Sequence, residues 1–139
     1  GYLAGDLNPK AVDLMRQNIA RWTRKIDTEF TPATVVCKDA RMWKEEPELR
    51  GKADVVLVNL PHDSFEHLPD LFSLFVPHGE GLLRGWAIIE RTSIDTRVEQ
   101  LERLVRAAGG TPKETRVSEI KDFSTTRIKV VFQTLIAWE

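Results

Sequence analysis

The sequence predicts an α/β protein in which strands and helices alternate to build a doubly wound, mixed β-sheet. Residues 53–61 contain an unbroken apolar run, which suits a central parallel strand buried on both faces. Segments with helical apolar spacing separate further strand-like segments along the chain. The last two apolar segments, residues 113–120 and 127–138, flank a polar turn and predict an antiparallel pair.

Composition limits the class of protein. With 139 residues, 42% of them hydrophobic and 29% charged, the chain suits one globular domain. The net charge of −1 provides no global basic field, so an RNA partner would be attracted mostly by segments elsewhere. The single cysteine excludes an internal disulfide and fits a reducing compartment. No apolar run approaches membrane-spanning length, so we expect a cytoplasmic protein without a membrane partner.

The first part of the chain predicts a strand, a helix and a second strand. The short strand at residues 2–5 ends in an acid, Asp6. Asn8 is a favourable N-cap and Pro9 a favourable first helical residue. The helix should end near Ile26, and its apolar stripe comprises Ala11, Leu14, Met15, Ile19, Trp22 and Ile26.

A second strand and an irregular segment come next. Residues 34–37 predict a short strand, with Asp39 just past its end. Residues 41–51 are charged and contain Pro47 and Gly51, which indicates a loop or a short helical turn. We expect Cys37 to be buried by packing.

The second half predicts helix, strand, helix and a final hairpin. The central strand must stop by Leu60, because Pro61 has no amide hydrogen for the ladder. A helix over residues 65–75, a strand over 81–89 and a helix capped by Asp95 follow. The sequence therefore gives the order β-α-β-loop-β-α-β-α-β-β. We expect three tryptophans on apolar stripes to lie in the core: Trp22, Trp86 and Trp138.

Polar residues at predicted strand ends are the candidate site. In open α/β sheets, ligands bind at the carboxyl ends of the strands. Asp6 there suits a bidentate hydrogen bond to two ribose hydroxyls, with capping of the following helix as the alternative. Asp39 can accept from an exocyclic amine while the Ala40 amide donates to a ring nitrogen, or it can simply form a turn. The carbonyl of Asn59, held rigid by Pro61, can accept hydrogen bonds at the reaction edge.

Other polar and aromatic residues have weaker claims to a role. His62 and His67 are five residues apart and face different sides of a helix, so we expect no metal site. Trp43, beside Asp39, is a candidate cover for a bound base. The basic residues between Arg16 and Lys25 suit a solvated helix face, with contact to tRNA as the alternative.

Three motifs together resemble those of class I S-adenosylmethionine-dependent methyltransferases. They are Asp-Leu-Asn-Pro-Lys-Ala at residues 6–11, Lys-Asp-Ala at 38–40 and Asn-Leu-Pro at 59–61. Their order and spacing are most similar to the archaeal and eukaryotic tRNA (guanine-N1)-methyltransferases and the related wybutosine-synthesis enzymes. A Glu-aromatic-Leu helix follows the last motif in that family, and this chain has Glu66, His67 and Leu68.

The resemblance implies a Rossmann-like fold and a cofactor site. It implies S-adenosylmethionine as the cofactor, bound by Asp6, Asn8, Asp39, Ala40 and Asn59, with Asn59 and Pro61 at the reaction centre. The implied reaction is methyl transfer to N1 of the guanosine 3′ of the anticodon of tRNA. Two alternatives remain open: transfer of the aminocarboxypropyl group of the same cofactor in wybutosine synthesis, and a non-catalytic binding module with a methyltransferase fold.

One departure from the family pattern is large. The first strand and the Gly-x-Gly loop that hold the methionine part of the cofactor have no counterpart in residues 1–139. We therefore expect the chain to be the C-terminal part of a methyltransferase catalytic domain, with the general base and most tRNA contacts upstream. Without that first strand, the strands ending at Asp6 and Leu60 have unpaired edges. We expect either direct pairing of these two strands or a partner chain between them.

Overall fold

The computed structural model describes residues 2–25 and 33–139. The chain divides into two compact units, Gly1–Trp43 and Lys44–Glu139. The order of strands and longer helices is the predicted one. In addition, the charged segment after the second strand forms a short 3-10 helix, η1 (Ala40–Glu45).

The first unit contains two strands and one long helix. β1 (Tyr2–Asp6) and β2 (Ala33–Cys37) pair in parallel, with Tyr2 opposite Ala33 and Asp6 opposite Cys37. α1 (Pro9–Lys25) begins where the sequence predicts, because Asn8 Oδ1 accepts a hydrogen bond of 3.0 Å from the Lys10 amide. The predicted helix end at Ile26 lies outside the described residues.

Burial in the first unit is lower than the sequence suggested. Val12 is the only described residue of α1 that is fully buried, whereas Leu14 is 59% and Trp22 is 49% exposed. The expected core position of Trp22 is therefore wrong, and so is the expected burial of Cys37, which is exposed. Both follow from the size of the described sheet, since two strands of five residues each offer little surface for packing.

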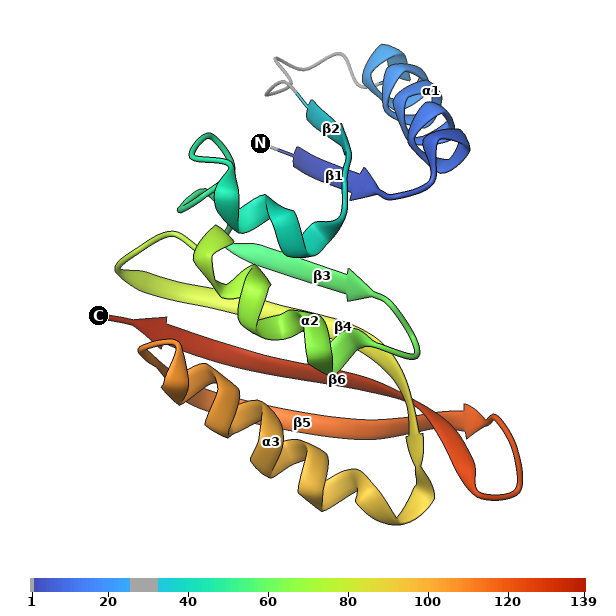
Figure 1. Cartoon of the computed structure of the whole chain (residues 1–139), viewed down its shortest axis with the longest axis vertical. Helices are drawn as coiled ribbons and strands as arrows, with labels where there is room; N and C mark the ends of the chain where they lie inside the picture. The colour runs from blue at the N-terminus through green and yellow to red at the C-terminus, as the bar shows by residue number, and fades with distance from the viewer. Residues whose placement is uncertain (1, 26–32) are drawn as a thin grey trace. The chain divides into compact units, whose positions relative to one another are not determined.

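The second unit is a four-stranded mixed sheet with the order β3-β4-β6-β5 (Figure 1). β3 runs parallel to β4, and both other pairs are antiparallel. The remaining elements are β3 (Val55–Asn59), α2 (Ser64–Leu71), η2 (Phe72–Leu74), β4 (Gly79–Glu90), η3 (Arg91–Ser93), α3 (Ile94–Ala107), β5 (Gly110–Asp122) and β6 (Arg127–Trp138).

Several boundaries differ from the predicted ones. The helix expected over residues 65–75 is α2 followed by the tighter turn η2. α3 starts at Ile94 after Ser93, so Asp95 lies in its first turn and is not its N-cap. β5 already starts at Gly110. The residue before it, Gly109, has φ 88°, a conformation that favours glycine and that ends the helical stretch.

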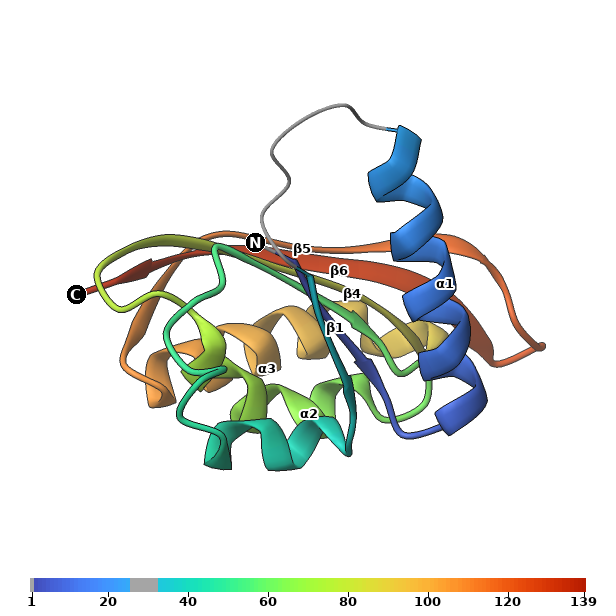
Figure 2. The same cartoon turned by 90° about the horizontal axis from the view of Figure 1, so that it is seen from above.

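The core of the second unit lies between the sheet and its two helices. α2 and α3 cover the same face of the sheet (Figures 1 and 2). The rings of Phe65 on α2 and Phe132 on β6 pack with their centroids 4.8 Å apart. Trp86 and Trp138 are only half-buried, so their predicted core positions hold in part. The side chains of the core with the least exposure are Leu68, Leu83, Leu101, Val105, Ile128, Val130, Phe132 and Ile136.

β3 is an edge strand in the described sheet, which contradicts the predicted central position. Its only sheet neighbour is β4, and Val56 and Val58 are buried toward the helices. On the opposite face Val55 is 52% and Leu57 is 64% exposed. The apolar run thus matches a strand that is covered on one face alone.

The expected direct pairing of the strands ending at Asp6 and Leu60 is also wrong. β1 pairs with β2, β3 pairs with β4, and the two pairs belong to separate hydrogen-bonded sheets. The other expectation, a partner chain that pairs with these strands, stays a prediction.

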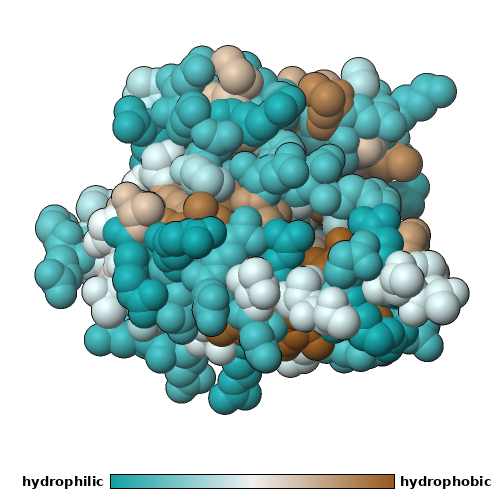
Figure 3. Space-filling view, turned by 60° about the horizontal axis from the view of Figure 1, so that its bottom comes forward, coloured by the Kyte–Doolittle hydropathy of each residue, from teal (hydrophilic) through white to brown (hydrophobic). Residues whose placement is uncertain are grey.

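Charged and polar residues cover most of the surface seen in Figure 3, with apolar residues exposed in scattered places between them. In the second unit, Lys44 forms an ion pair of 2.6 Å with Asp70. The Asp70 carboxylate raises the pKa of Lys44, and its hydrogen bond with the ammonium group is the largest cause. Within the described residues, none of the helices combines the length and apolarity needed to cross a membrane.

We predict that Gly85→Ala destabilises the second unit. A Cβ at Gly85 would lie 2.4 Å from Cζ of Phe132 and 2.8 Å from the carbonyl oxygen of Val58. Overpacking of this kind costs about 1–3 kcal/mol, which denaturant unfolding would measure. Ser118→Ala, an exposed position on β5, is the matched control and should change the free energy of unfolding by less than about 0.5 kcal/mol. Equal stability of the two variants would contradict the packing described for Gly85.

Candidate functional site

The two candidate acids of the first unit lie at the same edge of its sheet. β1 and β2 are parallel, and Asp6 is opposite Cys37 in their register. Asp39 follows two residues after Cys37. Parallel neighbours have their carboxyl ends at one edge, so Asp6 and Asp39 are both placed where ligands bind in open α/β sheets.

Asp6 shapes the turn between β1 and α1. Its Oδ1 accepts a hydrogen bond of 2.8 Å from the backbone amide of Asn8. Among the hydrogen bonds between described residues, Oδ2 of Asp6 has none. The carboxylate therefore combines a structural role, closing the turn before the helix, with an acceptor that remains open for a ligand.

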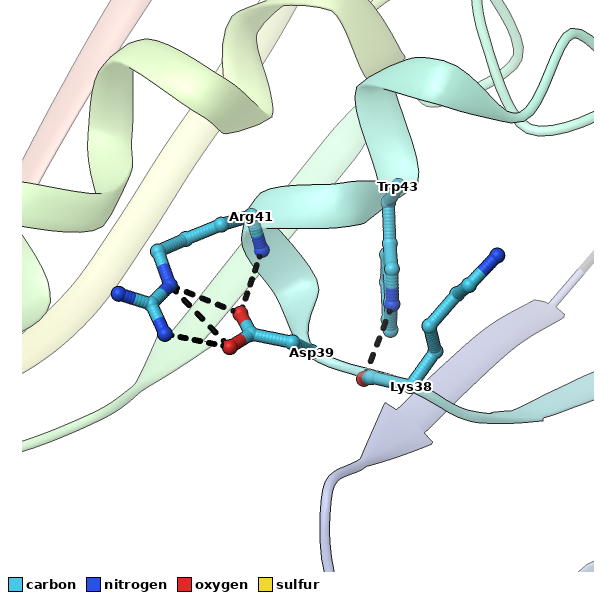
Figure 4. A network of polar contacts seen from close by, with 4 residues as sticks. All are labelled: Lys38, Asp39, Arg41 and Trp43. Carbon is cyan, nitrogen blue, oxygen red and sulfur yellow. Dashed lines mark hydrogen bonds and ion pairs between the residues drawn. The ribbon is translucent and has the colours of Figure 1, made fainter.

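Asp39 is bound by a neighbouring arginine (Figure 4). The guanidinium of Arg41 donates from Nε to both carboxylate oxygens, at 3.0 and 3.2 Å, and from one Nη to Oδ2 at 2.5 Å. The backbone amide of Arg41 adds a fourth bond of 2.9 Å to Oδ1. A bidentate pair is a strong arrangement, so any ligand amine at Asp39 must share the carboxylate with Arg41 or displace it. Apart from the charged character of residues 41–51, nothing in the sequence indicated this pairing.

Trp43 packs against the first strand. Its Nε1 donates to the carbonyl of Lys38 at 3.3 Å, as Figure 4 shows. A Cβ at Gly5 would lie 2.2 Å from Cζ2 of Trp43, so the indole fits there only because residue 5 is glycine. The ring thus lies beside the residue that precedes Asp6, while Ala40 opens η1 next to Asp39.

In the second unit, Asn59 ends β3 and starts a loop that is fixed to β4. Asn59 is opposite Trp86 in the parallel register, and its side chain is exposed without a hydrogen bond to another described residue. The carbonyl of Pro61 accepts a bond of 2.7 Å from the amide of Ile88. Asn59 is therefore an open polar group on an anchored backbone.

Ser64 is a further positioning residue, a role that the sequence did not indicate. It is only 1% exposed, and its hydroxyl lies 2.7 Å from the carbonyls of both Leu60 and Trp86. A buried hydroxyl between these carbonyls ties the loop after Asn59 to the end of β4. Loss of such a group usually costs more than its small size suggests, because buried acceptors lose their donor.

The described part of the chain contains no cluster of three or more His, Cys, Asp or Glu residues that could hold a metal ion. His62 and His67 are on the loop and on α2, respectively. They are not joined by any further metal-binding side chain in the described residues.

No protein-family model matches the chain, and no curated protein matches it by sequence. Solved structures do match. The structure of M. jannaschii TYW2 in complex with AdoMet has a TM-score of 0.76 and 18% identity. Trm5b from Pyrococcus abyssi has a TM-score of 0.75 and 20% identity, and the M. jannaschii tRNA m1G37 methyltransferase has 0.67 and 20%.

These likenesses span nearly all of this chain but only part of each neighbour. They cover 99% of this chain and 57% of the TYW2 chain, 98% and 37% for Trm5b, and 99% and 38% for the m1G37 enzyme. At these identities the comparison establishes the fold. The predicted resemblance is confirmed at that level: the chain has the Rossmann-like α/β fold of the class I S-adenosylmethionine-dependent methyltransferases.

Proposed function

We propose that the chain is the C-terminal part of the catalytic domain of an S-adenosylmethionine-dependent tRNA methyltransferase. The proposed reaction is methyl transfer to N1 of the guanosine 3′ of the anticodon. The observation that carries it is the placement of Asp6 and Asp39 at the carboxyl ends of neighbouring parallel strands. Similarity to the Trm5b and tRNA m1G37 methyltransferase structures supports this choice of reaction and substrate.

The residues of the first unit fit the nucleoside part of the proposed cofactor. Oδ2 of Asp6 is open to accept from a ribose hydroxyl, beside the Oδ1 that binds the Asn8 amide. Asp39 and the Ala40 amide would recognise adenine, with Arg41 sharing the carboxylate. Trp43 offers an apolar ring beside this edge. When bound, S-adenosylmethionine supplies an electrophilic methyl group.

The loop after β3 would position the target base. Asn59 presents an amide whose carbonyl can accept from a base or from an amino group. Its backbone is fixed by the Pro61–Ile88 and Ser64–Trp86 hydrogen bonds, so the acceptor is preorganised. Transfer to N1 requires loss of the N1 proton to a general base, which we place in a segment outside this chain. tRNA would be held mostly by such segments as well, and the proposed location is the cytoplasm.

Aminocarboxypropyl transfer in wybutosine synthesis is the second candidate reaction. The likeness to TYW2 favours it, because the TM-score of 0.76 for that structure is as high as the 0.75 for Trm5b. The two reactions differ in which carbon beside the sulfonium faces the base. Mass spectrometry of tRNA after incubation with the cofactor distinguishes them, because the two added groups have different masses.

A non-catalytic binding module is the third possibility, and calorimetric titration with S-adenosylmethionine tests it. Heat of binding with this chain, or with a polypeptide extended upstream, supports the enzyme. Absence of binding in both would favour the module and refute the proposed function.

We predict that Asp6→Ala weakens cofactor binding by about 10- to 100-fold, since hydrogen bonds to a charged acceptor are worth about 1.5–3 kcal/mol. Titration calorimetry of whichever polypeptide binds the cofactor measures the change. Asp13→Ala is the matched control, because Asp13 is an exposed acid on α1 that forms an ion pair of 3.4 Å with Arg16 on the same helix. Equal affinities of the two variants would remove Asp6 from the proposed site.

Ser64→Ala should loosen the loop that carries Asn59 and Pro61. The carbonyls of Leu60 and Trp86 lose the hydroxyl that lies 2.7 Å from each of them, so the free energy of unfolding should fall by about 1–3 kcal/mol. The amide of Ile88, which donates to the Pro61 carbonyl, should exchange its hydrogen faster. Ser118→Ala is again the control. Unchanged exchange at Ile88 would show that Ser64 does not anchor the loop.

A further inference from the structure

The turn between β5 and β6 presents an exposed aromatic ring at the ligand edge of the second unit. Phe123 is 53% exposed and follows directly after β5. In the antiparallel register of β4 and β6, Arg127 is opposite Glu90, the last residue of β4. The turn is therefore at the carboxyl end of β4, the same edge at which β3 ends with Asn59.

The ring of Phe123 lies close to the loop that carries the proposed reaction centre. The centroids of Phe123 and His62 are 6.2 Å apart, with an angle of 76° between the ring planes. His62 follows directly after Pro61. The guanidinium carbon of Arg127 lies 5.9 Å from the centroid of the Phe123 ring. A phenyl ring, an imidazole and a guanidinium thus gather at the loop that follows Asn59.

Backbone hydrogen bonds hold this turn in one conformation. The amides of Phe123 and Ser124 both donate to the carbonyl of Arg127 at 3.0 Å. The amide of Arg127 donates back to Ser124 Oγ at 3.2 Å. The amide of Arg91, after β4, donates to the carbonyl of Thr126 at 2.9 Å. The ring of Phe123 is consequently presented by a braced turn, which lowers the entropy lost when a ligand stacks on it.

Charges around the turn are largely balanced. The Arg91 guanidinium binds Asp122 and lies 3.3 Å from Glu119. These two acids raise the pKa of Arg91, and the hydrogen bond with Asp122 is the largest cause. Arg127 and Glu90 form an ion pair of 3.7 Å. Because each of these arginines is already paired with an acid, it attracts phosphates only weakly. A ligand here therefore gains more binding energy by stacking on the ring face than from electrostatic attraction.

We propose that Phe123, with His62 at its edge and Arg127 beside it, is a stacking platform for an unpaired nucleobase of the RNA substrate. The proposal rests on the proposed function, because it assigns the base to the tRNA that this edge would modify. Single-stranded RNA is recognised largely by stacking of splayed bases on aromatic and guanidinium groups. The platform would hold a base next to the target and so help to bring the target to Asn59.

Fluorescence anisotropy with a short labelled single-stranded RNA of guanosine and adenosine tests the platform. Phe123→Ala should weaken binding to the 139-residue chain by roughly 5- to 100-fold, the range that one base–aromatic stack contributes. Phe123→Trp should retain or strengthen binding, because it keeps an aromatic face. Phe123→Leu should behave like alanine, since it keeps the apolar bulk without the ring.

Two controls separate stacking from other effects. Ile120→Ala removes another exposed apolar side chain of the same hairpin, 49% exposed, and should leave the affinity unchanged. An abasic oligonucleotide of equal length retains the phosphates, and Phe123→Ala should not alter its binding. Absence of RNA binding by the unmodified chain, or equal loss in the Phe123→Ala and Ile120→Ala variants, would overturn the proposal.

Titration with S-adenosylmethionine distinguishes failure of the stacking platform from failure of the proposed function. Phe123→Ala should bind S-adenosylmethionine as the unmodified protein does, because the ring contacts no proposed cofactor residue. Absence of cofactor binding both in this chain and in the polypeptide extended upstream would refute the methyltransferase assignment. Failure of the RNA titration alone would refute the platform and leave the cofactor site intact.

Discussion

Parallel pairing of neighbouring strands determines which polar residues can act together in this protein. β1 and β2 bring Asp6 and Asp39 to one edge only because their carboxyl ends coincide. β3 and β4 do the same for Asn59 and the loop beyond it. A slip of one residue in either pair would turn each side chain to the opposite face, so the candidate residues of each unit depend on the register of its strands.

The candidate residues of the two units are prepared for ligands in different ways. The Asn59 loop is held by buried groups that a ligand does not displace, namely the Ser64 hydroxyl and the Ile88 amide. The carboxylate of Asp39 instead forms an ion pair with Arg41, whose side chain is 58% exposed. The pair is bidentate and strong, so a ligand amine must share the carboxylate with Arg41 or displace the guanidinium. Arg41 thus orients the Asp39 carboxylate before a ligand binds.

Local patterns in the sequence were sufficient to predict the helices and strands but not to predict which of their side chains are buried. Helix and strand positions follow from short-range signals such as Asn8 before Pro9, and β6 has the predicted bounds of residues 127–138. Burial depends instead on what a distant segment places opposite each side chain. That is why the exposure of Trp22 and Leu57, and the pairing of Asp39 with Arg41, could not be read from periodicity. The edge position of Asp6 and Asn59 was predictable, because a strand end is itself a local feature.

The exposed face of β3 bears directly on how complete the site is within these residues. A parallel strand is normally covered on both faces, yet Val55 and Leu57 together leave a continuous apolar face next to Asn59. The free edge of β3 also leaves backbone groups unpaired, which proteins usually cover. A strand supplied by further polypeptide would pair with this free edge, whereas Val55 and Leu57 need cover from an element packed on the face. The added strand would also end, if parallel, at the edge where Asn59 lies, so the element that completes the sheet would contribute its own carboxyl end to the site.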